Sequence, residues 1–175
     1  MKLKNIHAEV NINVTPKLMW KVLSRYGDIS QFHGGVRESH PEGESSPAAS
    51  LGCERVCNIV DMGLQIQLKE RIVEYVEGVS YTYDVYEWKN FPVQAMRFGF
   101  ALREINSNST TLVLDIDYRA KPAWLTLLLA PKMKKLARDI LLGYKHFAET
   151  GEKRVPLKAL KLRYSKPISK EMQFG

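Results

Sequence analysis

Residues 64 to 105 read LQIQLKERIVEYVEGVSYTYDVYEWKNFPVQAMRFGFALREI. Apolar and polar residues alternate through most of this stretch, which is the period of a β-strand with one buried face. Two breaks, Glu77-Gly78 and Asn90-Phe91-Pro92, are short enough for hairpin turns. The stretch therefore predicts three consecutive antiparallel strands, at Leu64–Val76, Val79–Trp88 and Val93–Ile105.

The same alternation continues on both sides of this stretch. Further strands are predicted at residues 6–14, 36–39, 52–61 and 110–120. The separators Met62-Gly63 and 106–109 (NSNS) are again short, whereas the polar segment 41–50 (PEGESSPAAS) predicts a longer loop. We therefore expect about seven strands, five of which form a continuous meander from Gly52 to Ala120.

One long helix follows the meander. From Leu125 to Glu149 the apolar residues recur with a period of about 3.6 residues, which is typical of an amphipathic helix. Pro131 should kink or restart this helix because it has no backbone N–H to donate, and Gly151 is a candidate left-handed cap. The opposite face is expected to be solvated; it carries Lys134, Lys135, Arg138, Lys145 and Glu149.

Two short helical segments are predicted after the first strand. Thr15-Pro16 supplies an N-cap and a proline at the first helical position of a helix that should end near Gly27. Asp28 is a second N-cap candidate, which predicts a helical turn over residues 29–32. The expected fold class is therefore α+β: a strongly curved antiparallel sheet wraps around the long C-terminal helix and leaves a hollow between them.

The composition fits one domain and an additional basic tail. The chain has 175 residues and a formal net charge of +7, of which residues 152–175 contribute +5 and residues 1–151 only +2. We expect a ligand-binding domain at 1–151 and a tail at 152–175. The small excess charge of the body argues against a nucleic-acid-binding protein, which needs a basic face within the fold.

The tail is amphipathic. Leu157, Leu160 and Tyr164 share one side of the segment 153–164 (KRVPLKALKLRY), and lysines lie opposite. Such a segment suits peripheral contact with an anionic membrane or an acidic partner, and it equally suits folding back onto its own body.

We see no pattern in the sequence that is typical of a targeting peptide, a membrane-spanning helix or a cofactor site. The start, MKLKNIHAEV, has no apolar block of a signal peptide, so we expect a cytoplasmic location. The longest apolar run, 123–131 (AWLTLLLAP), is under half of the roughly 20 residues that cross a bilayer.

Cys53 and Cys57 lie about 13 Å apart on one predicted strand, too far for a disulfide. Two thiols alone do not complete a zinc site, so we expect no metal and no cofactor.

Five short motifs follow one another along the chain: Gly52–Arg55, Glu70–Ile72, Tyr81–Tyr83, Phe91–Val93 and Tyr144–Gly151. Together with the order of the elements, they resemble the helix-grip fold of the START-like (SRPBCC) superfamily, in particular its polyketide cyclase/dehydrase-like branch, over about residues 3 to 150. The resemblance implies a cavity for a hydrophobic ligand such as a lipid, sterol, polyketide or plant hormone, and it implies enzymatic activity only in some members.

Glu70 is the main candidate residue in that cavity. It is in phase with Leu68, so the strand pattern turns it inward, and it matches a cavity-lining glutamate of the similar plant abscisic-acid receptors. The sequence departs from those receptors at 61–65 (DMGLQ), where their gate should be, and lacks their histidine-arginine-leucine latch. We interpret Glu70 as a polar anchor for a ligand, a general acid or base, or the partner of Arg55 or Arg97 in a structural ion pair.

Other residues complete the expected ligand site. Tyrosine hydroxyls can orient a ligand, and alternate residues of the strand 93–105 form an apolar stripe. The resemblance puts His33 near the cavity mouth. The predicted ligand-binding residues are His33, Arg55, Cys57, Ile59, Leu68, Glu70, Tyr81, Tyr83, Met96, Phe98, Phe100, Leu136, Ile140 and Gly143.

The strand pattern and the family resemblance predict different orientations for the side chains of Asp115 and Asp117. Alternation with Leu114 and Ile116 puts both carboxylates outside, whereas the resemblance places Asp115 near the cavity. We favour the outward orientation. If both pointed inward, they would raise each other's pKa and become the best acid/base candidates.

Three functions remain open at this point. The leading hypothesis is a carrier or sensor that binds a small hydrophobic, lipid- or polyketide-like molecule between sheet and helix. The second is a cyclase, aromatase or dehydratase that uses Glu70 or a tyrosine for proton transfer, although no nucleophile and base occur at a recognisable spacing. The third is a membrane-docked lipid-transfer accessory protein that uses the tail. None of these patterns predicts an oligomeric state.

Overall fold

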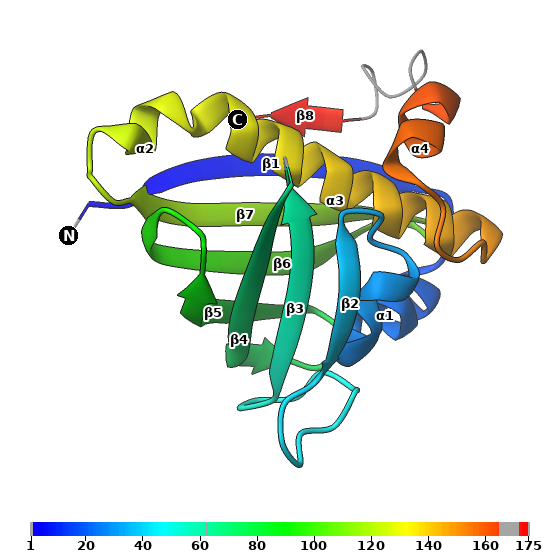
Figure 1. Cartoon of the computed structure of the whole chain (residues 1–175). Helices are drawn as coiled ribbons and strands as arrows, with labels where there is room; N and C mark the ends of the chain where they lie inside the picture. Colours follow the sequence, from blue (N-terminus) through cyan, green and yellow to red (C-terminus); the bar gives the residue numbers. More distant parts are fainter. Residues whose placement is uncertain (1, 62, 165–171, 175) are drawn as a thin grey trace.

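One curved sheet makes up most of the molecule (Figure 1). The computed structural model describes residues 2–61, 63–164 and 172–174. Within them, eight strands pair in the order β2-β3-β4-β5-β6-β7-β1-β8, each antiparallel to its neighbours. The strands are β1 (Lys4–Ile12), β2 (Val36–Pro41), β3 (Glu54–Asp61), β4 (Leu64–Val76), β5 (Ser80–Lys89), β6 (Val93–Asn106), β7 (Ser109–Ala120) and β8 (Met172–Phe174).

The helices lie on one side of this sheet (Figure 1). They are α1 (Pro16–Leu23), the 3-10 helix η1 (Tyr26–Gln31), α2 (Leu125–Leu128), α3 (Ala130–Thr150) and α4 (Leu157–Arg163). The α+β class, the curved sheet and the long helix are confirmed. The sheet has eight strands rather than about seven, because β8 of the tail adds to the edge at β1. No helix in the described ranges is long and apolar enough to cross a bilayer.

Helix α3 covers only one part of the concave face. It packs against β1 and β7, where Ala137 and Leu141 are completely buried in the same core as Ala8 and Val10 of β1. Strands β3 to β6 curve around below it (Figure 1). The space between these strands and α3 is therefore not filled by helix packing.

Local signals set the helix ends. Helix α2 ends at Leu128 and α3 starts at Ala130, with Pro131 in its first turn, as the missing N–H of proline requires. Gly151 caps α3 in the left-handed conformation, with a φ of 73°. The hydroxyl of Thr15 accepts a hydrogen bond from the Leu18 amide at the start of α1. The turn predicted for residues 29–32 lies in the 3-10 helix η1, where Asp28 has non-helical dihedral angles (φ −106°, ψ 17°) at a kink between two helical turns; its carboxylate accepts a hydrogen bond from Arg25.

The face of α3 predicted to be solvated is exposed at Lys134 and Lys135 but not at Lys145. Lys145 is buried, and its ammonium group donates to the carbonyl oxygen of Asn11 and to the Glu149 carboxylate, both at 2.8 Å. The tail folds back over the same half of the helix. Helical periodicity could not show this, because the covering segments come from the first strand and from the tail.

The tail packs onto α3 through α4. Leu160 is buried, Lys161 pairs with Asp139 of α3 at 2.9 Å, and Tyr164 is hydrogen-bonded to His146. Of the alternatives given for the tail, these residues follow the one in which the segment folds back onto its own body. The charges counted at Lys166, Lys170 and Glu171 lie outside the described residues.

Asp115 and Asp117 point away from the interior, as the alternation predicts. Asp115 is hydrogen-bonded to His7 at 2.9 Å and Asp117 accepts from Asn5 at 3.0 Å, both on the outer face of the sheet. The placement of Asp115 that the resemblance implied is wrong, because its strand neighbours Leu114 and Ile116 occupy the inner face.

Gly143 is a close contact point between α3 and the segment after η1. A Cβ atom at this position would lie 2.5 Å from the carbonyl oxygen of Phe32, which real structures do not tolerate.

We therefore expect Gly143→Ala to lower the free energy of unfolding by about 2 kcal/mol, because the added methyl group overpacks the site and this cost exceeds the helix preference of alanine. Urea denaturation measures this loss. As a control, Gly99→Ala, whose Cβ meets only atoms at 3.7 Å or beyond, should be near neutral; equal stability of the two variants would refute the close contact.

Candidate functional site

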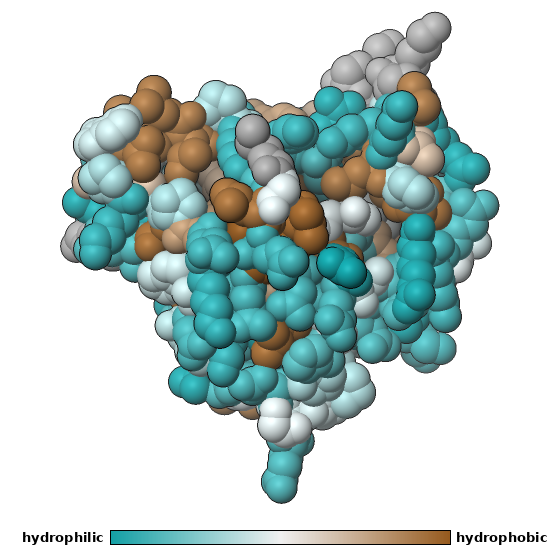
Figure 2. Space-filling model, in the orientation of Figure 1, coloured by the Kyte–Doolittle hydropathy of each residue, from teal (hydrophilic) through white to brown (hydrophobic). Residues whose placement is uncertain are grey.

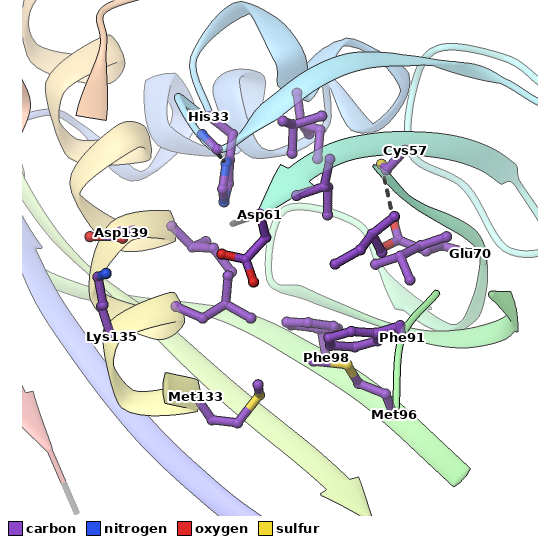
Figure 3. Close-up of a pocket in the computed structure, with 18 of the residues that line it drawn as sticks. His33, Cys57, Asp61, Glu70, Phe91, Met96, Phe98, Met133, Lys135 and Asp139 are labelled. Atoms are coloured by element: carbon purple, nitrogen blue, oxygen red, sulfur yellow. Dashed lines mark hydrogen bonds between the residues drawn. The ribbon is translucent and has the colours of Figure 1, made fainter. Parts of the chain in front are cut away.

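A cavity of about 240 Å³ lies between strands β3 to β6 and helix α3 (Figure 3). Most of its wall is apolar. The apolar lining residues are Ile29, Val36, Ile59, Val60, Ile66, Leu68, Phe91, Met96, Phe98, Phe100, Met133, Leu136, Ile140 and Leu157. The chain therefore contains a partly open cavity that suits an apolar molecule.

Strand alternation turns these side chains inward. Met96, Phe98 and Phe100 of β6 are all buried, and Tyr83 of β5 is the register partner of Phe98. The rings of Tyr83 and Phe98 stack with centroids 5.0 Å apart. These rings form a rigid aromatic wall.

A buried ion pair lies in the wall of the cavity. Arg55 and Glu70 are opposite each other in the β3–β4 register and are only 1% and 3% exposed. The Nε group of Arg55 donates to Oε2 of Glu70, and its Nη1 group donates to the carbonyl oxygen of Tyr26 at 2.7 Å. Each charge is thus compensated inside the protein.

The guanidinium group of Arg55 is also enclosed by aromatic rings. It lies 4.0 Å from the ring centroid of Tyr26 and 4.7 Å from that of Tyr83, within the range of cation–π attraction. Burial is the largest single influence and lowers the pKa of Arg55, but the Glu70 carboxylate, together with Cys57, Tyr83 and Tyr26, outweighs it and holds this pKa above its usual value. Arg55 therefore carries a permanent positive charge beneath the apolar wall.

Cys57 is a neutral thiol in this site. Its Sγ atom donates to Oε2 of Glu70 at 3.6 Å, and burial first, then the Glu70 charge, raise the pKa of the thiol. The thiolate is the reactive form of cysteine, so Cys57 is a poor nucleophile here. Both cysteines are free, as the strand spacing predicted.

His33 points into the cavity from the segment after η1 (Figure 3). It is buried, and the Gly35 amide donates to its Nδ1 atom at 3.1 Å. Burial lowers the pKa of His33 to about 4, so the imidazole is neutral at pH 7. Since Nδ1 accepts a hydrogen bond, the ring proton is on Nε2, which is a donor for an oxygen atom of a ligand.

Charged side chains surround the opening. Lys132 of α3 pairs with Asp61 at the end of β3, and both are partly exposed and line the cavity. Lys161 of α4 and Asp139 of α3 form a second pair beside it, and Lys135 adds a further positive charge. The cavity is therefore apolar inside, polar at Arg55 and His33, and charged at its mouth.

Twelve of the fourteen predicted site residues line this cavity. Tyr81 does not, because it lies two residues before Tyr83, near the start of β5, and packs against Trp20 and Tyr26 instead. Its hydroxyl donates to Leu23 O at 3.3 Å. Gly143 does not either, because the backbone of Phe32 occupies the space beside it. Of the two arginines suggested as partners of Glu70, Arg55 is the one that pairs; Arg97 binds Asp84 on the outer face.

Sequence reasoning missed several lining residues. Met133 and Tyr144 lie on the apolar stripe of the long helix, one turn from Leu136 and Ile140. The helical periodicity could therefore have identified both as lining residues. Lys161 and Leu157 carried no such signal, since only the folding of the tail brings them to the mouth. Among the described residues, no three His, Cys, Asp or Glu side chains gather in a way that could hold a metal ion.

Comparison with known proteins agrees with this architecture. A family model described as polyketide cyclase / dehydrase and lipid transport matches residues 4–145. No curated protein matches the sequence.

Several solved structures share the fold. The Zhui aromatase/cyclase from Streptomyces sp. R1128 is 13% identical with a TM-score of 0.69, over 94% of this chain and 98% of that chain. Ara h 8.0201 is 16% identical with a TM-score of 0.66, over 83% and 97%. A START superfamily protein from Mycobacterium smegmatis is 11% identical with a TM-score of 0.62, over 79% and 95%. At these identities the likeness concerns the fold alone.

Removal of one partner of the buried ion pair should be costly. Glu70→Gln leaves the Arg55 charge buried without a counter-charge, so we expect a loss of about 3 kcal/mol in the free energy of unfolding. Asp84→Asn, which breaks the part-exposed pair with Arg97, should cost less than about 1 kcal/mol. Urea denaturation of both variants gives the comparison, and a Glu70→Gln protein as stable as Asp84→Asn would contradict the burial of the pair.

His33 should make stability depend on pH. Its pKa is about 4 in the folded protein against 6.5 as the ordinary value, so on acidification the unfolded chain takes up this proton first. The free energy of unfolding should therefore fall as pH decreases from 6.5 to 4, by at most about 3 kcal/mol from this residue. The variant His33→Gln should lose this part of the pH dependence, measured by denaturation at both ends of the range. The exposed His40→Gln variant should keep it; identical pH profiles for the two variants would rule out the assignment.

Proposed function

The chain belongs to the polyketide cyclase/dehydrase and lipid transport family, within the START-like superfamily, and on that premise we propose that it binds a small hydrophobic molecule in the cavity beneath α3. The observation that carries the proposal is the cavity of about 240 Å³ with an apolar wall. Its apolar side chains converge from strands β2, β3, β4 and β6 and from helices η1, α3 and α4, and α3 does not fill the space.

The polar groups of the cavity define the chemistry of the ligand. Nε2–H of His33 and the guanidinium group of Arg55 both favour an oxygen atom that accepts hydrogen bonds, such as a hydroxyl or carbonyl oxygen. The aromatic wall at Tyr83 and Phe98 suits a ring or an acyl chain. The ligand is therefore an apolar body with an oxygen at its inner end, as lipid- and polyketide-like molecules have.

We favour binding over catalysis. The Glu70 carboxylate is held by the adjacent Arg55, and the Cys57 thiol is neutral, so neither is free to transfer a proton or to attack a substrate. A carboxylate fixed in this way orients Arg55 instead. The aromatase/cyclase among the solved structures shares the fold, and its activity is not carried over to this chain.

Filling the cavity should weaken ligand binding. Leu136 lines the cavity and is half-buried, so Leu136→Trp should place an indole ring in the space with little strain. Binding of the apolar fluorescent probe Nile red should weaken by about tenfold or more, because the ring removes most of the ligand volume. Fluorescence titration measures the affinity, and thermal denaturation shows that the variant is folded.

The matched control is Leu51→Trp, since Leu51 is exposed and lies outside the cavity. It should bind Nile red like the unmodified protein. Native mass spectrometry of the purified chain should also detect co-purified apolar molecules that are lost in Leu136→Trp. Equal affinity of the two variants, together with an empty protein in the mass spectrum, would overturn the proposed function.

A further inference from the structure

Helix α2 and its N-cap residue Trp124 expose three large apolar side chains. Trp124, Leu127 and Leu128 are 65%, 71% and 65% exposed, and Figure 2 shows the apolar surface that gathers over this helix. Single exposed apolar side chains are common on proteins, but three large ones on one short helix and its N-cap form a patch that favours an apolar environment.

The orientation of this patch is fixed by hydrogen bonds. The hydroxyl group of Tyr118 donates to the carbonyl oxygen of Thr126 at 2.7 Å, and the Ala120 amide donates to the Thr126 hydroxyl at 3.0 Å. Thr126 therefore anchors α2 to the end of β7, and Trp124, Leu127 and Leu128 are left on the outward side. The exposure results from a docked helix and not from a frayed end.

The segment of the chain that carries the patch is rich in positive charge. Residues 118–138 contain six basic residues and no acidic residue. The basic residues are Arg119, Lys121, Lys132, Lys134, Lys135 and Arg138. Lys134 and Lys135 are exposed and make no ion pair within the described part of the chain. A surface of this charge complements an anionic one and repels a second copy of itself.

The patch adjoins the mouth of the cavity. The Met133 amide donates to the Leu129 carbonyl oxygen at 2.9 Å, so the helical backbone continues from α2 into α3 and places Lys132 one turn after Leu128. Lys132 pairs with Asp61 across the opening, and the exposed side chains of Val60 and Leu64 lie beyond it on the β3–β4 hairpin. Apolar side chains thus occur on both sides of the opening.

We propose that α2 docks on an anionic lipid bilayer, with Trp124, Leu127 and Leu128 in the interfacial layer and the neighbouring lysines at the lipid phosphates. Tryptophan and leucine beside lysines are the composition that favours this layer. In this orientation the cavity mouth faces the membrane, and a hydrophobic ligand can pass between bilayer and cavity without crossing water. The tail helix α4 is a poorer anchor, because its Leu160 is already buried against the body.

The double variant Leu127→Glu/Leu128→Glu tests this docking surface. Co-sedimentation with vesicles of phosphatidylcholine containing about 30% phosphatidylserine should show a partition coefficient reduced by about tenfold or more. The unmodified protein should bind these vesicles better than pure phosphatidylcholine vesicles, and about 0.5 M salt should weaken its binding. Equal binding of the double variant and the unmodified protein would overturn the proposal.

Two matched controls locate the contact. Leu51→Glu adds the same charge at a 67% exposed leucine in the loop before β3 and should reduce partitioning much less than the double variant. Leu162→Glu makes the same change on α4, and a loss there as large as in the double variant would assign the contact to the tail and refute docking through α2. Nile red binding should be unchanged in the double variant, so a failure of docking is distinct from a failure of ligand binding.

Tryptophan fluorescence gives an independent measure of insertion. Trp20 is buried and Trp88 is half-buried, so the exposed Trp124 should dominate a blue shift upon vesicle binding. Trp124→Phe should keep most of the binding and lose this shift. Binding without any shift in the unmodified protein would overturn insertion, and a dimer in solution that the double variant abolishes would assign the patch to self-association instead.

Discussion

The width of a single helix determines where this protein has empty space. A helix with its side chains is about 10 Å across, whereas neighbouring strands are about 4.8 Å apart, so one helix covers roughly two strands. Helix α3 covers β1 and β7, and strands β3 to β6 must curve around a volume that no helix enters. The cavity beneath α3 is therefore a consequence of pairing an eight-stranded sheet with one long helix.

The polar groups in the cavity satisfy each other before any ligand arrives. Arg55 is paired with Glu70, hydrogen-bonded to the backbone of Tyr26 and enclosed by two aromatic rings. A charge without these partners would be too costly to bury. The Glu70 carboxylate therefore acts first on Arg55 and on the stability of the fold, and only through them on a ligand. His33 differs, because its Nε2–H group remains available to the cavity.

Ligand entry and surface docking are connected by the chain itself. The helical backbone that carries the exposed apolar patch of α2 runs directly into the first turn of α3, where Lys132 pairs with Asp61 across the opening. Pro131 separates the two helices but keeps them adjacent, since a proline in a first turn removes only a donor that has no helical partner. The surface around the opening is thus basic and apolar together, while the interior is mainly apolar.

Much of the fold could be predicted from the sequence, because strand phase, proline breaks and glycine caps are local properties. The alternation of Leu68 with Glu70, the break at Pro131 and the cap at Gly151 each depend on residues within a few positions of one another. For the same reason the inward phase of most cavity residues was correct. Only the tertiary structure decided that Arg55 rather than Arg97 pairs with Glu70, that Tyr81 packs against α1, that Lys145 is buried and that the tail reaches the mouth. These outcomes depend on which distant segments meet, and no local pattern contains that information.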